Sequence, residues 1–142
     1  MSTDNPANWV ERRVLSERLL KTGALEFWNQ IRSALQDACQ SFNSHYVEDG
    51  RFPQRVEAKL ENGLRIRIVV PSRREAMVEM LVVEFDRALS VVSATTDSGP
   101  GRTLPMRSDG LSVFVVFGGR NLNADEVSEE LLENLFPFPG AR

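Results

Sequence analysis

The side chains that most often carry catalysis or bind metals are scarce in this sequence. There is one histidine, His45, and one cysteine, Cys39. Hydrolytic triads need a nucleophile beside a histidine, and zinc sites need several ligands together. We therefore predict no catalytic set, no metal site and no cofactor. His45 is expected just past a helix end, near the last carbonyls or water, and Cys39 is expected to be a small core residue.

Basic residues give no clear anion-binding or nucleic-acid site either. The densest cluster contains Arg65, Arg67, Arg73 and Arg74, but acidic residues share the expected strand face and no aromatic residues interleave for base stacking. The net charge of −3 also lacks the positive footprint of a nucleic-acid binder. We expect no nucleic-acid partner.

Two glycine-rich turns are weak candidates for anion binding. Gly99-Pro100-Gly101-Arg102 has a proline that removes a donor N–H, and no helix follows it. Gly118-Gly119-Arg120 follows a strand and precedes a helix, although Asp125 and Glu126 would repel an anion there. We interpret both segments as turns.

Two carboxylates interrupt an apolar segment and keep an enzymatic alternative open. Glu79 and Glu84 could act as acid or base if a pocket raised the pKa of either group, and Asp86 lies nearby. The simpler interpretation is an exposed strand edge. A small enzyme that uses an acidic residue is the third functional alternative.

Length and composition predict one domain. A chain of 142 residues with 42% apolar and 26% charged residues can bury an independent core. No apolar run approaches the ~20 residues of a membrane span, and the N-terminus does not read as a secretory signal. With a single cysteine, the sequence favours a cytoplasmic protein with no membrane contact. Residues 1–7 are expected to form a flexible tail.

The first predicted element is a helix over about 9–43. Asn8 and Glu11 have capping-box spacing, and apolar residues then recur at helical steps. Thr22-Gly23 is the weak point, because glycine costs roughly 1 kcal/mol in a helix interior. A bend there, or two helices end to end, remains open.

A hairpin is predicted next, from two segments with alternating apolar residues around Asn62-Gly63. A three-residue loop, 61–63, keeps one apolar face by setting Leu60 opposite Leu64. The same register sets Ala58 opposite Ile66 and Glu57 opposite Arg67.

The segment 72–96 has two interpretations. Its many β-branched residues favour a hairpin, 76–85 and 88–96, whereas Ser72, Glu75 and an apolar stripe would suit a single helix over 73–90. We favour the hairpin.

The C-terminal third should contain a turn-rich loop at 97–103, a short strand near 103–107, a strand over Leu111–Phe117 and a closing helix. That last strand has apolar side chains on both faces, which is typical of a strand in mid-sheet that is covered on both sides. Asn123 and Glu126 have capping-box spacing, Leu122 and Val127 a staple spacing, and Pro137 should end the helix.

The predicted fold class is α+β. It has a long N-terminal helix, a five- to six-stranded mostly antiparallel sheet and a short C-terminal helix, packed as a two-layer sandwich with both helices on one face. The order of elements is similar to that of dimeric secretion chaperones and of helix-grip ligand-binding domains. Fold alone assigns no function.

The surplus of apolar strand residues leads to two functional hypotheses. The first is a non-catalytic protein-interaction domain, chaperone- or adaptor-like, which forms a homodimer through the second apolar face of the sheet. The second is a small-molecule domain whose apolar pocket lies between a curled sheet and the long helix. The residues predicted for the pocket or interface are Phe27, Trp28, Val83, Val92, Phe114 and Val116.

Overall fold

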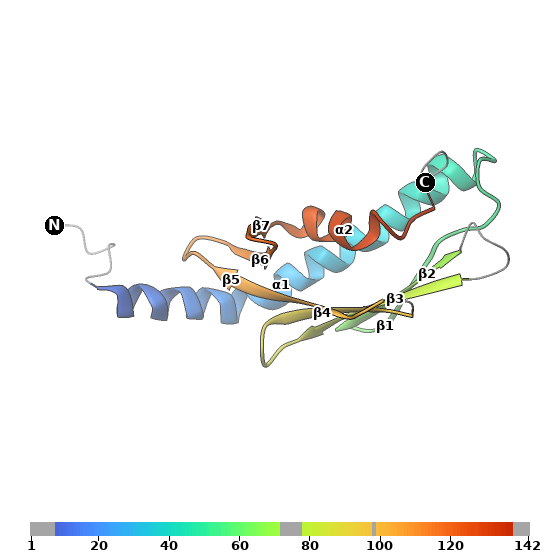
Figure 1. The fold of residues 1–142 in the computed structure, drawn as a ribbon. Helices are drawn as coiled ribbons and strands as arrows, with labels where there is room; N and C mark the ends of the chain where they lie inside the picture. The colour runs from blue at the N-terminus through green and yellow to red at the C-terminus, as the bar shows by residue number, and fades with distance from the viewer. Residues whose placement is uncertain (1–7, 72–77, 98, 138–142) are drawn as a thin grey trace.

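The structure, a computed structural model, describes residues 8–71, 78–97 and 99–137. Two helices lie on one face of a single sheet, with the long helix running obliquely across it and the short helix beside the long one (Figure 1). This confirms the α+β class and the two-layer packing. The tail expected at residues 1–7 lies outside the described residues.

The long helix α1 (Trp9–Phe42) is continuous through Gly23. The side chain of Asn8 accepts a hydrogen bond from the Glu11 amide, as its capping position predicts. Neither a break nor two separate helices is present. A Cβ added at Gly23 would lie 3.1 Å from Cγ2 of Val113, so glycine lets the helix approach the sheet closely. A short π-helical segment, η1 (Asn43–Val47), follows α1.

Seven antiparallel strands form the sheet in chain order, so each strand pairs with the next. That is slightly more than the predicted five or six. The strands are β1 (Glu57–Asn62), β2 (Arg65–Pro71), β3 (Val78–Asp86), β4 (Val91–Thr96), β5 (Arg102–Ser108), β6 (Val113–Phe117) and β7 (Arg120–Leu122).

The register predicted for the first hairpin is wrong by two residues. Leu60 pairs with Ile66 rather than Leu64, and Ala58 pairs with Ile68. An irregularity between Leu60 and Asn62 lengthens the turn, and the Leu64 carbonyl accepts a hydrogen bond from Phe85 of β3. The apolar side chains still share one face, because a shift of two preserves the alternation.

The same shift removes a predicted charge pair. Glu57 lies opposite Val69, not opposite Arg67, whose partner is Lys59.

The segment after residue 77 is a hairpin, as favoured, and not a helix. β3 and β4 pair from Asp86 with Val91 to Leu81 with Thr96. The Asp86 side chain accepts a hydrogen bond from the Leu89 amide in the connecting turn. The Ser72 capping position of the helical alternative lies outside the described residues.

The apolar strand β6 does not lie in mid-sheet. The unpredicted three-residue strand β7 pairs with it through Gly118 and Gly119, both at positive φ, as a tight hairpin turn requires. Only Val115 of β6 is fully buried. The physical reason is position: β6 is next to the last strand, and the helices cover one face of it only.

The closing helix α2 (Ala124–Leu132) begins with the predicted capping box of Asn123 and Glu126. Leu122 and Val127, the predicted staple, are both buried. The helix ends at Leu132, earlier than Pro137, and a turn carries Phe136 back onto Phe42 of α1.

The core lies between the helices and one sheet face. Trp28, Ile31 and Leu35 of α1 pack there with no exposed surface. They contact every second residue of the strands, because every second side chain of a strand points to the same face of the sheet. These strand residues include Ile66, Ile68, Leu81, Val83, Val92, Leu104, Met106 and Val115.

Candidate functional site

Three of the residues predicted for a pocket or interface lie in the packed core. Trp28, Val83 and Val92 have no exposed surface. The Trp28 ring stacks on Phe85 with 5.9 Å between centroids, and its Nε1 donates to the Gly63 carbonyl at 2.8 Å. Trp28 therefore ties the β1–β2 turn to α1.

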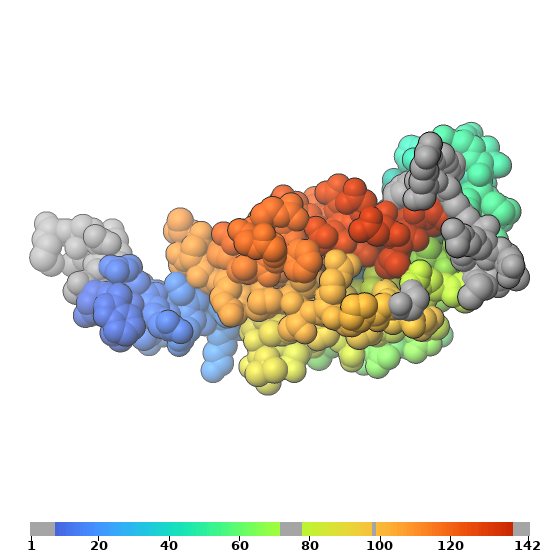
Figure 2. Space-filling view, in the orientation of Figure 1, coloured from blue at the N-terminus to red at the C-terminus, as the bar shows by residue number. Residues whose placement is uncertain are grey.

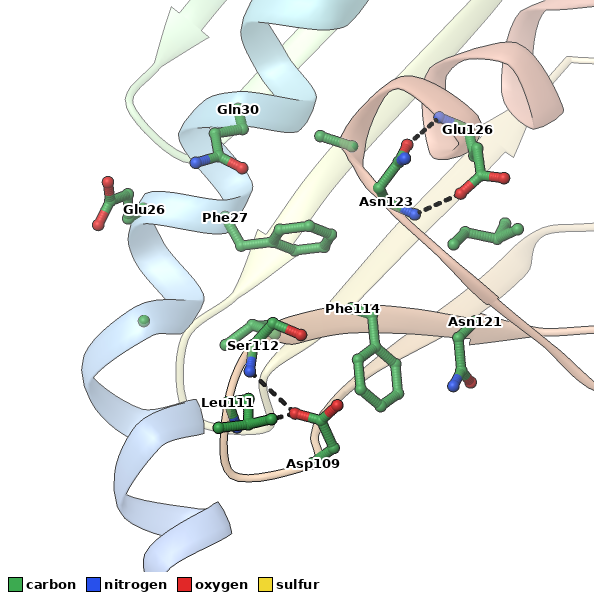
Figure 3. A pocket seen from close by; sticks show the side chains of 14 residues that line it. Glu26, Phe27, Gln30, Asp109, Leu111, Ser112, Phe114, Asn121, Asn123 and Glu126 are labelled. Carbon is green, nitrogen blue, oxygen red and sulfur yellow. Dashed lines mark hydrogen bonds between the residues drawn. The ribbon is translucent and has the colours of Figure 1, made fainter.

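Phe27 and Phe114 both line a groove, which we call the β6 groove, from opposite sides of β6. It has a volume of about 670 Å³ and lies between α1, the start of β6 and the β7–α2 junction. Figure 3 shows the Phe27 ring pointing from α1 toward the strand, while the Phe114 ring leaves that strand on its other side. Leu111, which is 89% exposed, also lines the groove.

Several polar groups of the β6 groove are held by local structure. Asn123 and Glu126 bond to each other's backbone as the cap of α2. Asp109 accepts hydrogen bonds from the amides of Ser112 and Leu111, at 2.9 and 2.8 Å (Figure 3). These bonds lower the pKa of Asp109 from its ordinary value, because they favour the charged form. These groups shape the groove and are not poised for acid–base chemistry.

The face of the sheet away from the helices is mixed in character. Val116 and Phe114 lie on this face, both half-buried. Further along it, Val82 lies between Arg67 and Thr95 on the neighbouring strands. Apolar side chains on this face are thus interrupted by polar ones.

Two arginines of this face, Arg65 and Arg67, are neutralised by neighbouring carboxylates. Glu61 lies 2.7 Å from both Arg65 and Arg67, and Glu84 lies 3.7 Å from Arg65. Guanidinium groups engaged in this way are poorly placed to take phosphate or nucleic acid.

The carboxylates considered for catalysis are divided between the two faces of β3. Strand alternation puts Glu79 on the same face as buried Leu81, and puts Glu84 and Asp86 on the opposite face. The three groups therefore do not converge on one site.

The candidate anion site at Gly118-Gly119-Arg120 is occupied by an internal ion pair. Arg120 lies 2.9 Å from Glu130 of α2, and Arg102 lies 3.7 Å from the same carboxylate. This pairing holds α2 against β5 and β7.

Cys39 and His45 do not form a site. Cys39 is buried on α1, and burial raises the pKa of its thiol to about 12. His45 is exposed in η1, past the end of α1, and its carbonyl accepts a hydrogen bond from Arg51. Within residues 8–71, 78–97 and 99–137, no three His, Cys, Asp or Glu side chains are grouped to hold a metal ion.

The outer edge of β1 is protected against strand pairing. Val56, just before β1, has its N–H and C=O bonded to the side-chain amide of buried Asn43, at 2.8 Å each. Asn43 thus takes the place of a neighbouring strand. Sequence reasoning missed this role, because only the fold brings Asn43 and Val56 together.

Further along β1, the bond from Phe85 to the Leu64 carbonyl fixes which backbone groups point outward. Backbone N–H and C=O groups of successive residues point to opposite sides of a strand. In this register, the N–H and C=O groups of Ala58 and Leu60 therefore point away from β2, to the open edge. If two copies paired edge to edge with Ala58 of each opposite Leu60 of the other, Lys59 would face Lys59. Such like-charge contact opposes pairing.

The largest exposed apolar group lies at the other end of the molecule, on the first turns of α1. We call residues 9–20 the α1 overhang. Its first turns extend beyond the sheet (Figure 1) and form a separate projection in the space-filling view (Figure 2), whereas Ser16, Leu19 and Leu20 are half-buried near the sheet. Trp9 is 67% exposed. Most of the exposed large apolar side chains of the described residues gather here, just after this segment on α1, or at the nearby β3–β4 turn: Trp9, Val10, Val14, Leu15, Leu25 and Leu89.

A second groove, of about 600 Å³, opens at the base of this overhang, and we call it the root groove. Leu20 and Leu25 of α1 line one wall, and Phe85 and Leu89 line the other. The residues predicted from the sequence for a pocket or interface did not include Val10, Val14 or Leu89. The stripe of α1 was the available signal, since its steps of three and four residues continue from Leu20 through Glu17 and Arg13 back to Val10.

Comparison with protein families, curated proteins and solved structures finds no match to this chain. Among the helices of the described residues, none is both long and apolar enough to cross a membrane.

Proposed function

We propose that this domain is a non-catalytic protein-interaction domain that works through the α1 overhang and the root groove. The observation that carries the proposal is the concentration of exposed apolar side chains there, with Trp9 67% and Leu89 69% exposed. Apolar surface gathered in one place is typical of binding sites rather than of ordinary surface.

The marginal stability of a projecting helix gives independent support. An isolated helix of about 12 residues is marginal in water, because helices gain most of their stability by packing an apolar face. The overhang has such a face and nothing among the described residues packs on its first turns. A bound protein would supply the missing contacts.

The test replaces Val10 and Val14 together by glutamate in the full chain. Glutamate is at least as good a helix former as valine, so a loss of binding would reflect the lost apolar contact. Light scattering and a pull-down should show that the wild type associates with protein and that this variant does not. Arg12→Glu, on another face of the helix, should bind like the wild type. A wild-type monomer that captures no protein would remove the proposal.

A small apolar ligand is the second candidate, favoured by the β6 groove, which both Phe27 and Phe114 line. A ligand bound there would raise the thermal midpoint of the wild type, because ligand binding to the native state stabilises it. A panel of apolar compounds should then stabilise the wild type but not Phe114→Ala. No shift for any compound would leave only the first proposal.

A further inference from the structure

We infer that the occupant of the α1 overhang is a second copy of this chain, whose own overhang packs antiparallel to the first. The inference rests on the proposed function and specifies its partner. It depends on the pattern of side chains along one face of α1 and on the position of the root groove.

A single stripe runs along α1 with alternating steps of three and four residues. Its covered part contains Ala24, Phe27 and Ile31, which are buried against the sheet. Its N-terminal part, which is uncovered except at half-buried Leu20, contains Val10, Arg13, Glu17 and Leu20. Steps of three and four keep side chains on one face of a helix, and this spacing is that of helices that pair along their length.

The N-terminal part of the stripe is complementary to itself when read backward. Consider an antiparallel pair whose two-fold axis crosses the helices at the level of residue 15. Val10 of one copy then faces Leu20 of the other, and Arg13 faces Glu17. Apolar groups then meet apolar groups and each cation meets an anion, twice over, by the two-fold symmetry. Polar residues within such a seam fix the register and orientation of the pair.

The two charged side chains are already close in one copy. Nε of Arg13 lies 3.5 Å from Glu17 of the same helix, and both side chains are largely exposed. In the pair these charges form a four-membered network, in which every arginine has a carboxylate on its own helix and another across the seam. Such a network is worth more than a single surface pair.

The same register brings Trp9 to the root groove. Trp9 of one copy lies at the level of Lys21 of the other, and Lys21 lines that groove beside Leu20, Leu25 and Leu89. An indole ring in this position covers the exposed leucines and can place its face against the lysine ammonium, a favourable arrangement. The overhang and the groove thus satisfy each other reciprocally.

The area buried is that of a weak, reversible dimer. A helix of about 12 residues is about 18 Å long and about 10 Å across, so covering half of it removes on the order of 350 Å² from water. The stripe that each copy inserts is also the stripe that it presents, so each copy loses this area once, and the contact of Trp9 with Leu25 and Leu89 in the root groove adds to it. A stable specific interface buries roughly 800 Å² per partner, so the pair forms at high protein concentration and dissociates on dilution.

Two other surfaces are less suitable for a second copy. Pairing at the β1 edge is opposed by Asn43 and by the meeting of Lys59 with Lys59. The open face of the sheet has Arg67 and Thr95 beside Val82, so its apolar area is interrupted.

Charge reversal across the seam tests the antiparallel register. The variants Arg13→Glu and Glu17→Arg each turn two attractive contacts into repulsive ones, so each alone should dimerise roughly tenfold more weakly than the wild type. An equal mixture of the two should form a heterodimer, because each position 13 then faces an opposite charge at position 17. The double variant should dimerise like the wild type. Arg12→Glu, off the stripe, is the matched control.

Sedimentation velocity of the full chain from micromolar to millimolar concentration, with circular dichroism to confirm folding, gives the readout. The inference is overturned if the wild type stays monomeric, or if the mixture associates no better than the single variants. If the wild type is a monomer that captures another protein, and the variant with glutamate at positions 10 and 14 does not, the proposed function stands without the second copy. A monomer that captures nothing would remove both.

Discussion

Asn43 is a residue whose structural role depends on a contact across the fold. Its amide bonds both backbone groups of Val56, and both residues are buried. A buried backbone group left without a partner costs about 1–3 kcal/mol. We therefore expect Asn43→Ala to lower the free energy of unfolding by about 2–4 kcal/mol in urea titrations.

Ser44→Ala is the control for Asn43, because Ser44 is the next residue and is exposed. It should change the unfolding free energy by less than about 0.5 kcal/mol, as surface substitutions usually do. Equal stability of the Asn43→Ala variant and the wild type would show that the amide does not protect Val56.

Cys39 should behave as an inert thiol in the native protein. Burial raises the pKa of this thiol to about 12, whereas in an unfolded chain it ionises near 8.5. The shift therefore stabilises the folded state below the unfolded pKa, and this contribution is lost as pH rises from there toward the folded pKa.

The measurement for Cys39 is its reaction with a thiol reagent near pH 8. The native protein should react no faster than it unfolds, and the protein in urea should react at once. Immediate reaction of the native protein would contradict the burial of Cys39.

At the scale of the elements, Gly23 sets how closely α1 approaches β6. A Cβ at this position would lie 3.1 Å from Val113, so a larger side chain must push helix and strand apart. We expect Gly23→Leu to lower the unfolding free energy by about 1–3 kcal/mol in spite of better helix propensity. Thr22→Leu, at an exposed neighbouring position, should not destabilise the protein. Equal behaviour of the two variants would contradict the close approach.

Local signals in the sequence predicted the elements well. The caps at Asn8 and Asn123 depend on side chains three residues apart, so they can be identified without knowing the fold. The β-branched content of 78–96 likewise favoured strands over a helix.

Features set by distant contacts could not be predicted in the same way. The register of β1 with β2 depends on the irregularity before Asn62 and on the bond between Leu64 and Phe85. β7 has only three residues, Arg120–Leu122, too few for a periodic pattern.

At the scale of the whole molecule, the sequence could not say which apolar side chains remain exposed. Trp28, Val83 and Val92 belong to the core, whereas Trp9 and Val10 are exposed, although all five are apolar. The difference arises because α1 extends beyond the sheet, and the position of the sheet end depends on the packing of seven strands. The stripe was visible in the sequence, but the uncovered part of it was not.

Amide hydrogen exchange of residues 9–20 tests most directly whether the α1 overhang is the interface. If two copies pair there, exchange in this segment should slow as protein concentration rises, because pairing stabilises a helix that is otherwise marginal. The core residues Ile31 and Leu35 of the same helix should stay protected at every concentration. Fast exchange of residues 9–20 that is independent of concentration would contradict the account.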